Sequence, residues 1–166
     1  MNSQVKKPKA PRIITGLDEL KTLIGNEVAV SDWLLIDQAR IEAFADVTED
    51  HQWIHLDVER CARESPYKAP IAHGYLILSL IPMLFETSLR IDGLAMTVNY
   101  GLDRVRMPSP VIAGQRIRGH LELEKLDEVK GGMQAHWAVT VEVEGGDKPA
   151  CVAQMLARYY ENSTSH

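Results

Sequence analysis

Two segments of the chain hold the side chains best suited to acid–base chemistry. Asp50 and His55 lie in the first, which reads DHQWIH, and His73 precedes Gly74 in the second, which reads APIAHGY. A carboxylate and an imidazole five residues apart in a turn can meet on one water molecule, remove a proton from it and return a proton to a substrate carbon. The alternative is that Asp50 caps the backbone of a loop and His55 is a hydrogen-bonded structural residue.

Other chemistries fit these residues less well. His51 and His55 form an H-x-x-x-H pair, but Gln52 stands where a zinc protease has Glu, and no metal site is predicted. Cys61 and Cys151 lie in no motif typical of a catalytic thiol, so we expect both to be small packing residues. The sequence contains no G-x-S-x-G, G-x-G-x-x-G or P-loop motif, which argues against a serine hydrolase and against a nucleotide site.

Gly74 comes just before the longest apolar run, residues 75–85 (YLILSLIPMLF). About 20 residues are needed to span a bilayer, so the run predicts a buried helix. Pro82 removes a backbone donor, and we expect one bent helix over 74–89; the alternative is a second segment starting near Pro82. Free amides at the helix start, beside a glycine, could hold an oxyanion. The alternative is a tight-turn glycine with His73 as a cap or packing residue.

The rest of the chain must position these groups. The first half predicts a helix near 16–24, an extended segment at 27–35, a helix at 38–45, a polar loop at 47–56 and a helix at 58–63. The second half predicts strands at 95–107, 115–126, 133–144 and 148–161, and the third alternates strictly between apolar and polar residues. These elements indicate one α+β domain, with a curved antiparallel meander wrapped around one long central helix.

Composition limits the function classes. The 166 residues include 23 acidic and 18 basic ones, so a general nucleic-acid binder is not expected. Two cysteines cannot form a disulfide framework, which favours a reducing cytoplasmic location. The apolar run at 75–85 is too short to span a bilayer, so no membrane partner is expected. Residues 1–12 contain four basic residues and no acidic one, and we expect them to form a flexible tail before a domain at 13–162.

The motifs FAxxTEDxxxIHxD at 44–57 and PIAHG at 70–74 resemble the hydratase motif of MaoC-like (R)-specific enoyl-CoA hydratases, which have the hot-dog fold. DHQWIH at 50–55 and NYGLDRVR at 99–106 are most similar to the branch related to nodulation protein N. The similarity covers about residues 15–160. The commoner motif reads Gly-Asp-x-Asn-Pro-Ile-His, whereas Glu49 precedes Asp50 here and Gln52-Trp53 replaces Asn-Pro.

The resemblance implies reversible hydration of a trans-2-enoyl-CoA to an (R)-3-hydroxyacyl-CoA. Asp50 and His55 match the catalytic dyad, and the Gly74 amide would face the thioester oxygen. Ser79 falls near the dyad, and His73 would share the substrate side of the site with Gly74. The implied reaction needs no metal or redox cofactor, because coenzyme A is part of the substrate.

The resemblance also implies partners. Coenzyme A is a polyanion and the chain is acidic, so a local basic patch is expected. The candidates for phosphate contacts are Arg104, Arg106, Arg116 and Arg118, unless these form a solvated strand face. A homodimer is implied, with sheets paired edge to edge.

Two other functions remain open on the same fold. One is an acyl-CoA thioesterase, although its acid usually lies on the helix and the nearest here is Glu86, far from the helix start. The other is a non-catalytic module that binds an acyl ligand or a partner.

Overall fold

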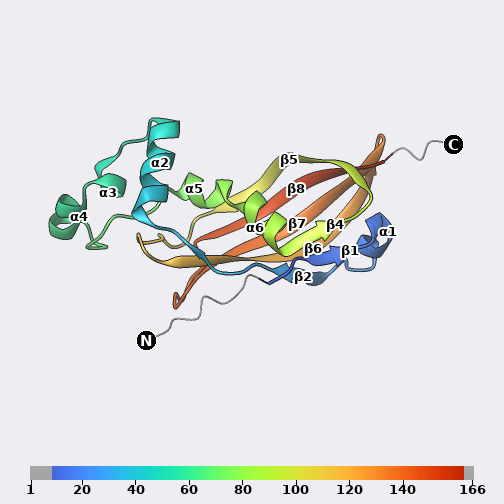
Figure 1. Cartoon of the computed structure of the whole chain (residues 1–166), viewed down its shortest axis with the longest axis horizontal. Helices are drawn as coiled ribbons and strands as arrows, with labels where there is room; N and C mark the ends of the chain where they lie inside the picture. The colour runs from blue at the N-terminus through green and yellow to red at the C-terminus, as the bar shows by residue number, and fades with distance from the viewer. Residues whose placement is uncertain (1–8, 163–166) are drawn as a thin grey trace.

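In the computed structural model, which describes residues 9–162, a curved antiparallel sheet wraps around two short helices (Figure 1). The helices are α1 (Gly16–Lys21), α2 (Gln38–Thr48), α3 (Trp53–Leu56), α4 (Val58–Glu64), α5 (Gly74–Ser79) and α6 (Ile81–Ser88). The strands are β1 (Arg12–Ile14), β2 (Asn26–Val30), β3 (Leu34–Leu35), β4 (Leu89–Ile91), β5 (Leu94–Arg106), β6 (Arg116–Val129), β7 (Gly132–Val143) and β8 (Cys151–Glu161). The predicted α+β class is confirmed.

The core lies between the sheet and α6. The strand order is β2-β6-β7-β8-β5, and alternate residues of β7 point into the core, as its sequence period predicts. Trp137 on β7 is fully buried, and its indole N–H donates to the Tyr159 hydroxyl at 2.9 Å. Phe85 of α6 meets the Trp137 ring edge-on at a centroid distance of 5.1 Å. This contact fixes α6 across the inner face of the sheet.

The predicted single helix over 74–89 is wrong, because α5 ends at Ser79 and α6 begins at Ile81. Pro82 lies in the first turn of α6. It has no N–H to donate to the preceding turn, and proline is tolerated best at a helix start. The alternative of a second segment near Pro82 is therefore the arrangement found.

The strand order also differs from a simple meander. β6, β7 and β8 are consecutive neighbours, but β5 lies beside β8 at the end of the sheet. A parallel pair of three-residue strands, β1 and β4, was not predicted, since such short segments show no period. Lys9 and Arg12, from the predicted tail, contact the domain: the Lys9 amide donates to Asp32 and the Arg12 guanidinium to the Val28 carbonyl. The rest of that tail, 1–8, lies outside the described residues.

A helical segment, residues 37–64, projects from one end of the sheet (Figure 1). Its first helix starts where predicted, at the cap Asp37, whose carboxylate accepts from the Arg40 amide. The predicted loop at 47–56 is wrong in part, because 53–56 form α3. Four residues form a helix here because neighbouring side chains hold it: Gln38 donates to the His55 carbonyl, and the Cys61 thiol lies 3.5 Å from the Ile54 carbonyl. Among the described helices, none is long and apolar enough to cross a membrane.

Candidate active site

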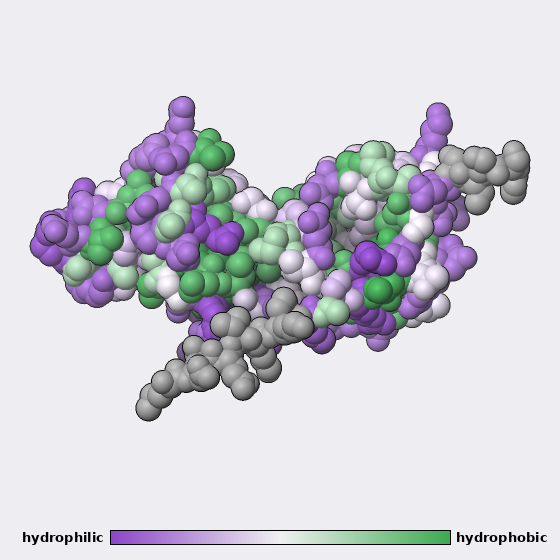
Figure 2. All heavy atoms as spheres, in the orientation of Figure 1, coloured by the Kyte–Doolittle hydropathy of each residue, from purple (hydrophilic) through white to green (hydrophobic). Residues whose placement is uncertain are grey.

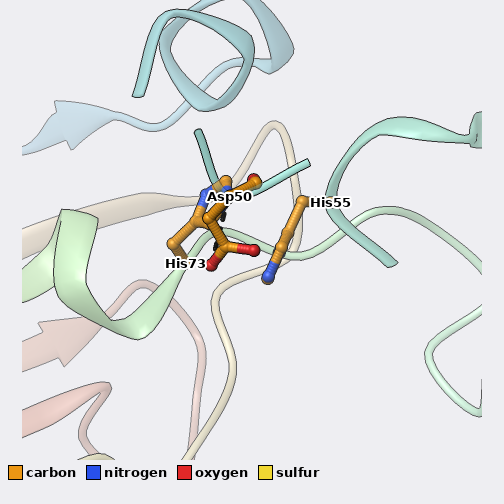
Figure 3. A group of neighbouring side chains, drawn as sticks. All are labelled: Asp50, His55 and His73. Atoms are coloured by element: carbon orange, nitrogen blue, oxygen red, sulfur yellow. Dashed lines mark hydrogen bonds and ion pairs between the residues drawn. The ribbon is translucent and has the colours of Figure 1, made fainter. Parts of the chain in front are cut away.

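Three side chains from separate elements converge at the junction of the helical segment and the sheet. Asp50 follows α2, His55 lies in α3 and His73 directly precedes α5. One nitrogen or oxygen atom of each lies within 4.8 Å of those of the other two. Figure 3 shows the Asp50 carboxylate and a ring nitrogen of His55 directed toward the same space. The structure therefore brings the predicted pair together and adds His73 to it.

The His55 ring is held in one orientation. Its Nδ1 lies 2.7 Å from the Ile71 carbonyl, and a carbonyl only accepts, so Nδ1 carries the proton and Nε2 is the free acceptor. The side chain is only 8% exposed, and this burial lowers the pKa of His55 below its usual value. A lowered pKa keeps the ring neutral near pH 7. His55 is thus a base whose lone pair is available.

Asp50 supplies the exposed half of the pair, with 54% of its side chain accessible. Two hydrogen bonds of about 2.8 Å that meet at a tetrahedral water span about 4.6 Å. The carboxylate oxygen of Asp50 and the ring nitrogen of His55 lie within 4.8 Å of each other, a distance that suits one water held between them. This arrangement favours the acid–base interpretation over the structural one.

The backbone before Asp50 turns through an unusual conformation. Glu49 has φ of 59°, in the left-handed region that favours glycine. The commoner family motif has Gly at this position, so the structure explains that preference. The turn reverses the chain after α2 and directs Asp50 back toward His55.

Replacing Glu49 with Gly is expected to raise the free energy of unfolding by about 0.5–1 kcal/mol, because it removes a left-handed side-chain conflict. Urea unfolding measures this change. A matched control is Glu59→Gly in the right-handed helix α4, which should lose about 1 kcal/mol. Equal destabilisation by both substitutions would contradict the prediction.

His73 does not take the place expected of a substrate contact. It is 2% exposed, and its Nε2–H donates to the Asp50 backbone carbonyl at 2.9 Å. The cluster with Asp50 and His55 has the spacing of a metal site, but His55 Nδ1 and His73 Nε2 are both engaged with carbonyls. The Asp50 carboxylate and the free nitrogen of His55 are the groups directed into the shared space, fewer than the three or four protein ligands of a zinc site.

Gly74 is the first residue of α5, where a backbone amide has no partner within the helix. A Cβ on Gly74 would overlap the Met107 sulfur, so a side chain there requires the Met107 side chain to move. Met107 follows β5 directly and is a site residue that the sequence analysis missed. Its only sequence signal is its place next to the NYGLDRVR motif.

Ser79 lies at the other end of α5. Its hydroxyl donates to the Leu76 carbonyl at 2.9 Å, which is the structural role expected of a helical serine. Ser79 also lines a hollow of about 600 Å³, together with Phe44, Tyr75 and Tyr100. Phe44 contacts the His73 ring as well, so the hollow begins beside the three converging residues. Figure 2 shows apolar surface where the helical segment meets the sheet.

The four candidate arginines fall into two pairs. On β6, Arg116 forms an ion pair with Glu144, directly after β7, and Arg118 forms one with Glu142 on β7. These carboxylates neutralise the charge of the two arginines. Arg104 and Arg106 are on β5, just before Met107, and no carboxylate of the described residues lies within ion-pair distance of either.

Neither thiol is poised for chemistry. Cys61 and Cys151 are buried and unpaired. Burial raises the pKa of the Cys61 thiol, and it raises that of Cys151 to about 11. Both thiols therefore stay protonated near neutral pH, which fits the predicted packing role.

Comparison with known proteins agrees with the fold and the motifs. Residues 19–146 match the family model described as "MaoC like domain". The chain is 42% identical over 149 residues to 3-hydroxyacyl-thioester dehydratase Z of Mycobacterium tuberculosis, covering 89% of this chain and 98% of that protein. It is 41% identical over 143 residues to Nodulation protein N of Rhizobium meliloti, covering 85% and 89%.

A solved structure, the R-hydratase PhaJ1 from Pseudomonas aeruginosa, superposes with a TM-score of 0.69 at 25% identity, covering 84% of this chain and 83% of that one. A curved antiparallel sheet wrapped around its helices defines a hot-dog protein, as the sequence motifs indicated. The chain belongs to the MaoC-like dehydratase family.

Proposed function

We propose that the protein catalyses the reversible hydration of a trans-2-enoyl-CoA to an (R)-3-hydroxyacyl-CoA. The observation that carries the proposal is the pairing of the Asp50 carboxylate with a neutral His55 whose Nε2 is free to accept a proton. Support comes from the relative named as a 3-hydroxyacyl-thioester dehydratase and the neighbour named as an R-hydratase.

Each residue has a distinct part in the proposed reaction. Asp50 accepts one proton of the water in a hydrogen bond, and His55 Nε2 removes the other as the oxygen bonds to C3. The electron pair of the C2–C3 double bond moves toward the thioester oxygen, where the Gly74 amide stabilises the negative charge. His55 then returns its proton to C2. The pair ends in its starting state, and neither a metal nor a redox cofactor is required.

One assay separates this function from its alternatives. Crotonyl-CoA is mixed with the protein while enoyl absorbance and free thiol are followed together. Loss of absorbance without thiol release supports hydration, whereas thiol release indicates a thioesterase. Glu86, the helix acid considered for a thioesterase, lines a hollow between α6 and β5 whose lining includes none of Asp50, His55 and Gly74, which weakens that alternative. No change across several chain lengths would favour a binding module and overturn the proposal.

We further propose that Arg104 and Arg106 contact the coenzyme A phosphates. Their charges are not neutralised by a described carboxylate, unlike those of Arg116 and Arg118. They are also close in sequence to Met107, which packs on Gly74.

Substituting either Arg104 or Arg106 with Glu should raise KM for crotonyl-CoA about threefold to tenfold, since each change reverses one exposed charge. KM for crotonyl-pantetheine, which lacks the nucleotide phosphates, should stay within about twofold. Lys130→Glu, in the turn after β6, is the matched control. Equal KM increases for both thioesters would show that these arginines do not act on the phosphates.

The working form is proposed to be a homodimer joined through β5. This strand ends the sheet order, and none of its 13 residues is buried within the described chain. Met96, Tyr100 and Leu102 on it are large and exposed. A long apolar edge strand is an aggregation hazard unless another strand covers it.

A Met96→Asp/Leu102→Asp double variant should be monomeric in multi-angle light scattering, because two carboxylates would be buried at the pairing edge. The wild-type chain should have the mass of a dimer. Val47→Asp, at an exposed apolar residue of α2, controls for the added charge. A monomeric wild type, or a double variant that remains dimeric, would exclude pairing through β5.

A further inference from the structure

His73 links the two members of the proposed pair without facing solvent. Its ring stacks on His55 with centroids 3.7 Å apart and planes 26° apart. The same ring lies 5.2 Å from Phe44, in a tilted contact. A ring in contact with two aromatic neighbours has little freedom to rotate, so it also restricts the plane of His55.

The polar contacts of His73 point toward Asp50. Nε2–H donates to the Asp50 backbone carbonyl at 2.9 Å and lies 4.0 Å from its carboxylate oxygen Oδ2. Asp50 follows the left-handed Glu49, and residues 50–52 belong to no helix or strand. One hydrogen bond from a buried donor therefore anchors the main chain that carries the catalytic carboxylate.

The remaining nitrogen of His73 indicates which tautomer is present. Nδ1 is buried and has no hydrogen-bond partner among the described residues. A buried N–H without an acceptor is costly, so the geometry favours a proton on Nε2 alone. The His73 ring lies 3.7 Å from the His55 ring, centroid to centroid. A positive charge on His73 would therefore also oppose the uptake of a proton by His55.

We propose that His73 is a positioning residue for the Asp50–His55 pair: its Nε2–H fixes the Asp50 main chain, its ring fixes the plane of His55, and it does not touch the substrate. The catalytic consequence rests on the proposed hydration. The geometry itself can be tested without any substrate. Among the described residues, the groups that act on the His55 ring are Asp50, His73 and the Ile71 carbonyl.

The test compares two variants that separate the contacts of His73. His73→Phe keeps an aromatic ring but removes the donor, whereas His73→Gln keeps an N–H donor but removes the ring. We expect His73→Phe to lower kcat for crotonyl-CoA about 10- to 100-fold with KM within about twofold, and His73→Gln to recover part of that loss. His51→Gln, an exposed histidine paired with Asp46, is the matched control and should keep full activity.

A second measurement distinguishes positioning from simple packing. Burial lowers the pKa of His55, and the stacked His73 ring covers one face of it. The acid limb of the kcat/KM profile should therefore move to higher pH in His73→Gln, which uncovers that face, and stay in place in His73→Phe, which keeps a ring there. A kcat within twofold of wild type in His73→Phe, together with an acid limb in His73→Gln that stays at the wild-type pH, would overturn the proposal.

Nitrogen-15 NMR of the histidine rings makes the test independent of both folding of the variants and activity. In the wild type, His73 should show the Nε2–H tautomer and His55 the Nδ1–H tautomer. An Nδ1–H tautomer at His73 would overturn the positioning proposal. A wild type that shows both expected tautomers but hydrates no enoyl thioester would instead overturn the proposed function.

Discussion

Replacing Asp50 with Asn, or His55 with Gln, is expected to lower kcat for crotonyl-CoA hydration at least about 100-fold. Asn keeps the size of Asp50 but loses the charge that orients water and favours protonation of His55. Gln removes the lone pair at Nε2, the only His55 nitrogen not engaged with a carbonyl. Steady-state loss of enoyl absorbance measures both effects.

The lowered pKa of His55 also predicts how the activity changes with pH. Burial lowers the pKa of His55, so the ring becomes protonated only below its ordinary value near 6.5. Activity that needs neutral His55 should therefore be full at pH 7 and fall as the pH drops through this lowered pKa. His51→Gln should retain the wild-type profile, and thermal melting checks that each variant is folded. Near-normal turnover in folded Asp50→Asn and His55→Gln would exclude the assignment.

The second large effect is expected from deleting the Gly74 amide. Gly74 is the first residue of α5, and His73 before it has φ of −59° and ψ of 135°, which a following proline accepts. Proline therefore fits the backbone here while removing the N–H. Because a side chain at Gly74 would overlap the Met107 sulfur, the substitution is made in a Met107→Ala background.

Gly74→Pro/Met107→Ala should lower kcat about 100- to 1,000-fold relative to Met107→Ala, the magnitude typical of losing one oxyanion donor. Gly74→Ala/Met107→Ala, which adds a Cβ but keeps the N–H, should lose far less. The comparison of these two double variants isolates the hydrogen bond from the bulk. Equal losses in both would mean that space at the helix start matters and that the amide does not.

Elements long enough to repeat their apolar–polar period several times, or marked by a capping residue, were predictable from sequence alone. The alternation along β7 and the cap at Asp37 identified a strand and a helix start close to their observed positions. Short elements were not: α3 is four residues long and is held by Gln38 and Cys61, so its own sequence carries no helical period. The place of β5 beside β8 is likewise a long-range pairing that no local signal records.

The sequence by itself determined the α+β class and predicted the Asp50–His55 pair, because side-chain type and local periodicity are properties of the chain. The tertiary structure decided how these groups are used. It assigned the free nitrogen of His55 through the Ile71 carbonyl, buried His73 between His55 and Phe44, and placed Met107 on Gly74. The tautomer of His55, the burial of His73 and the contact of Met107 with Gly74 all depend on residues that are distant in sequence. Only folding brings such residues together.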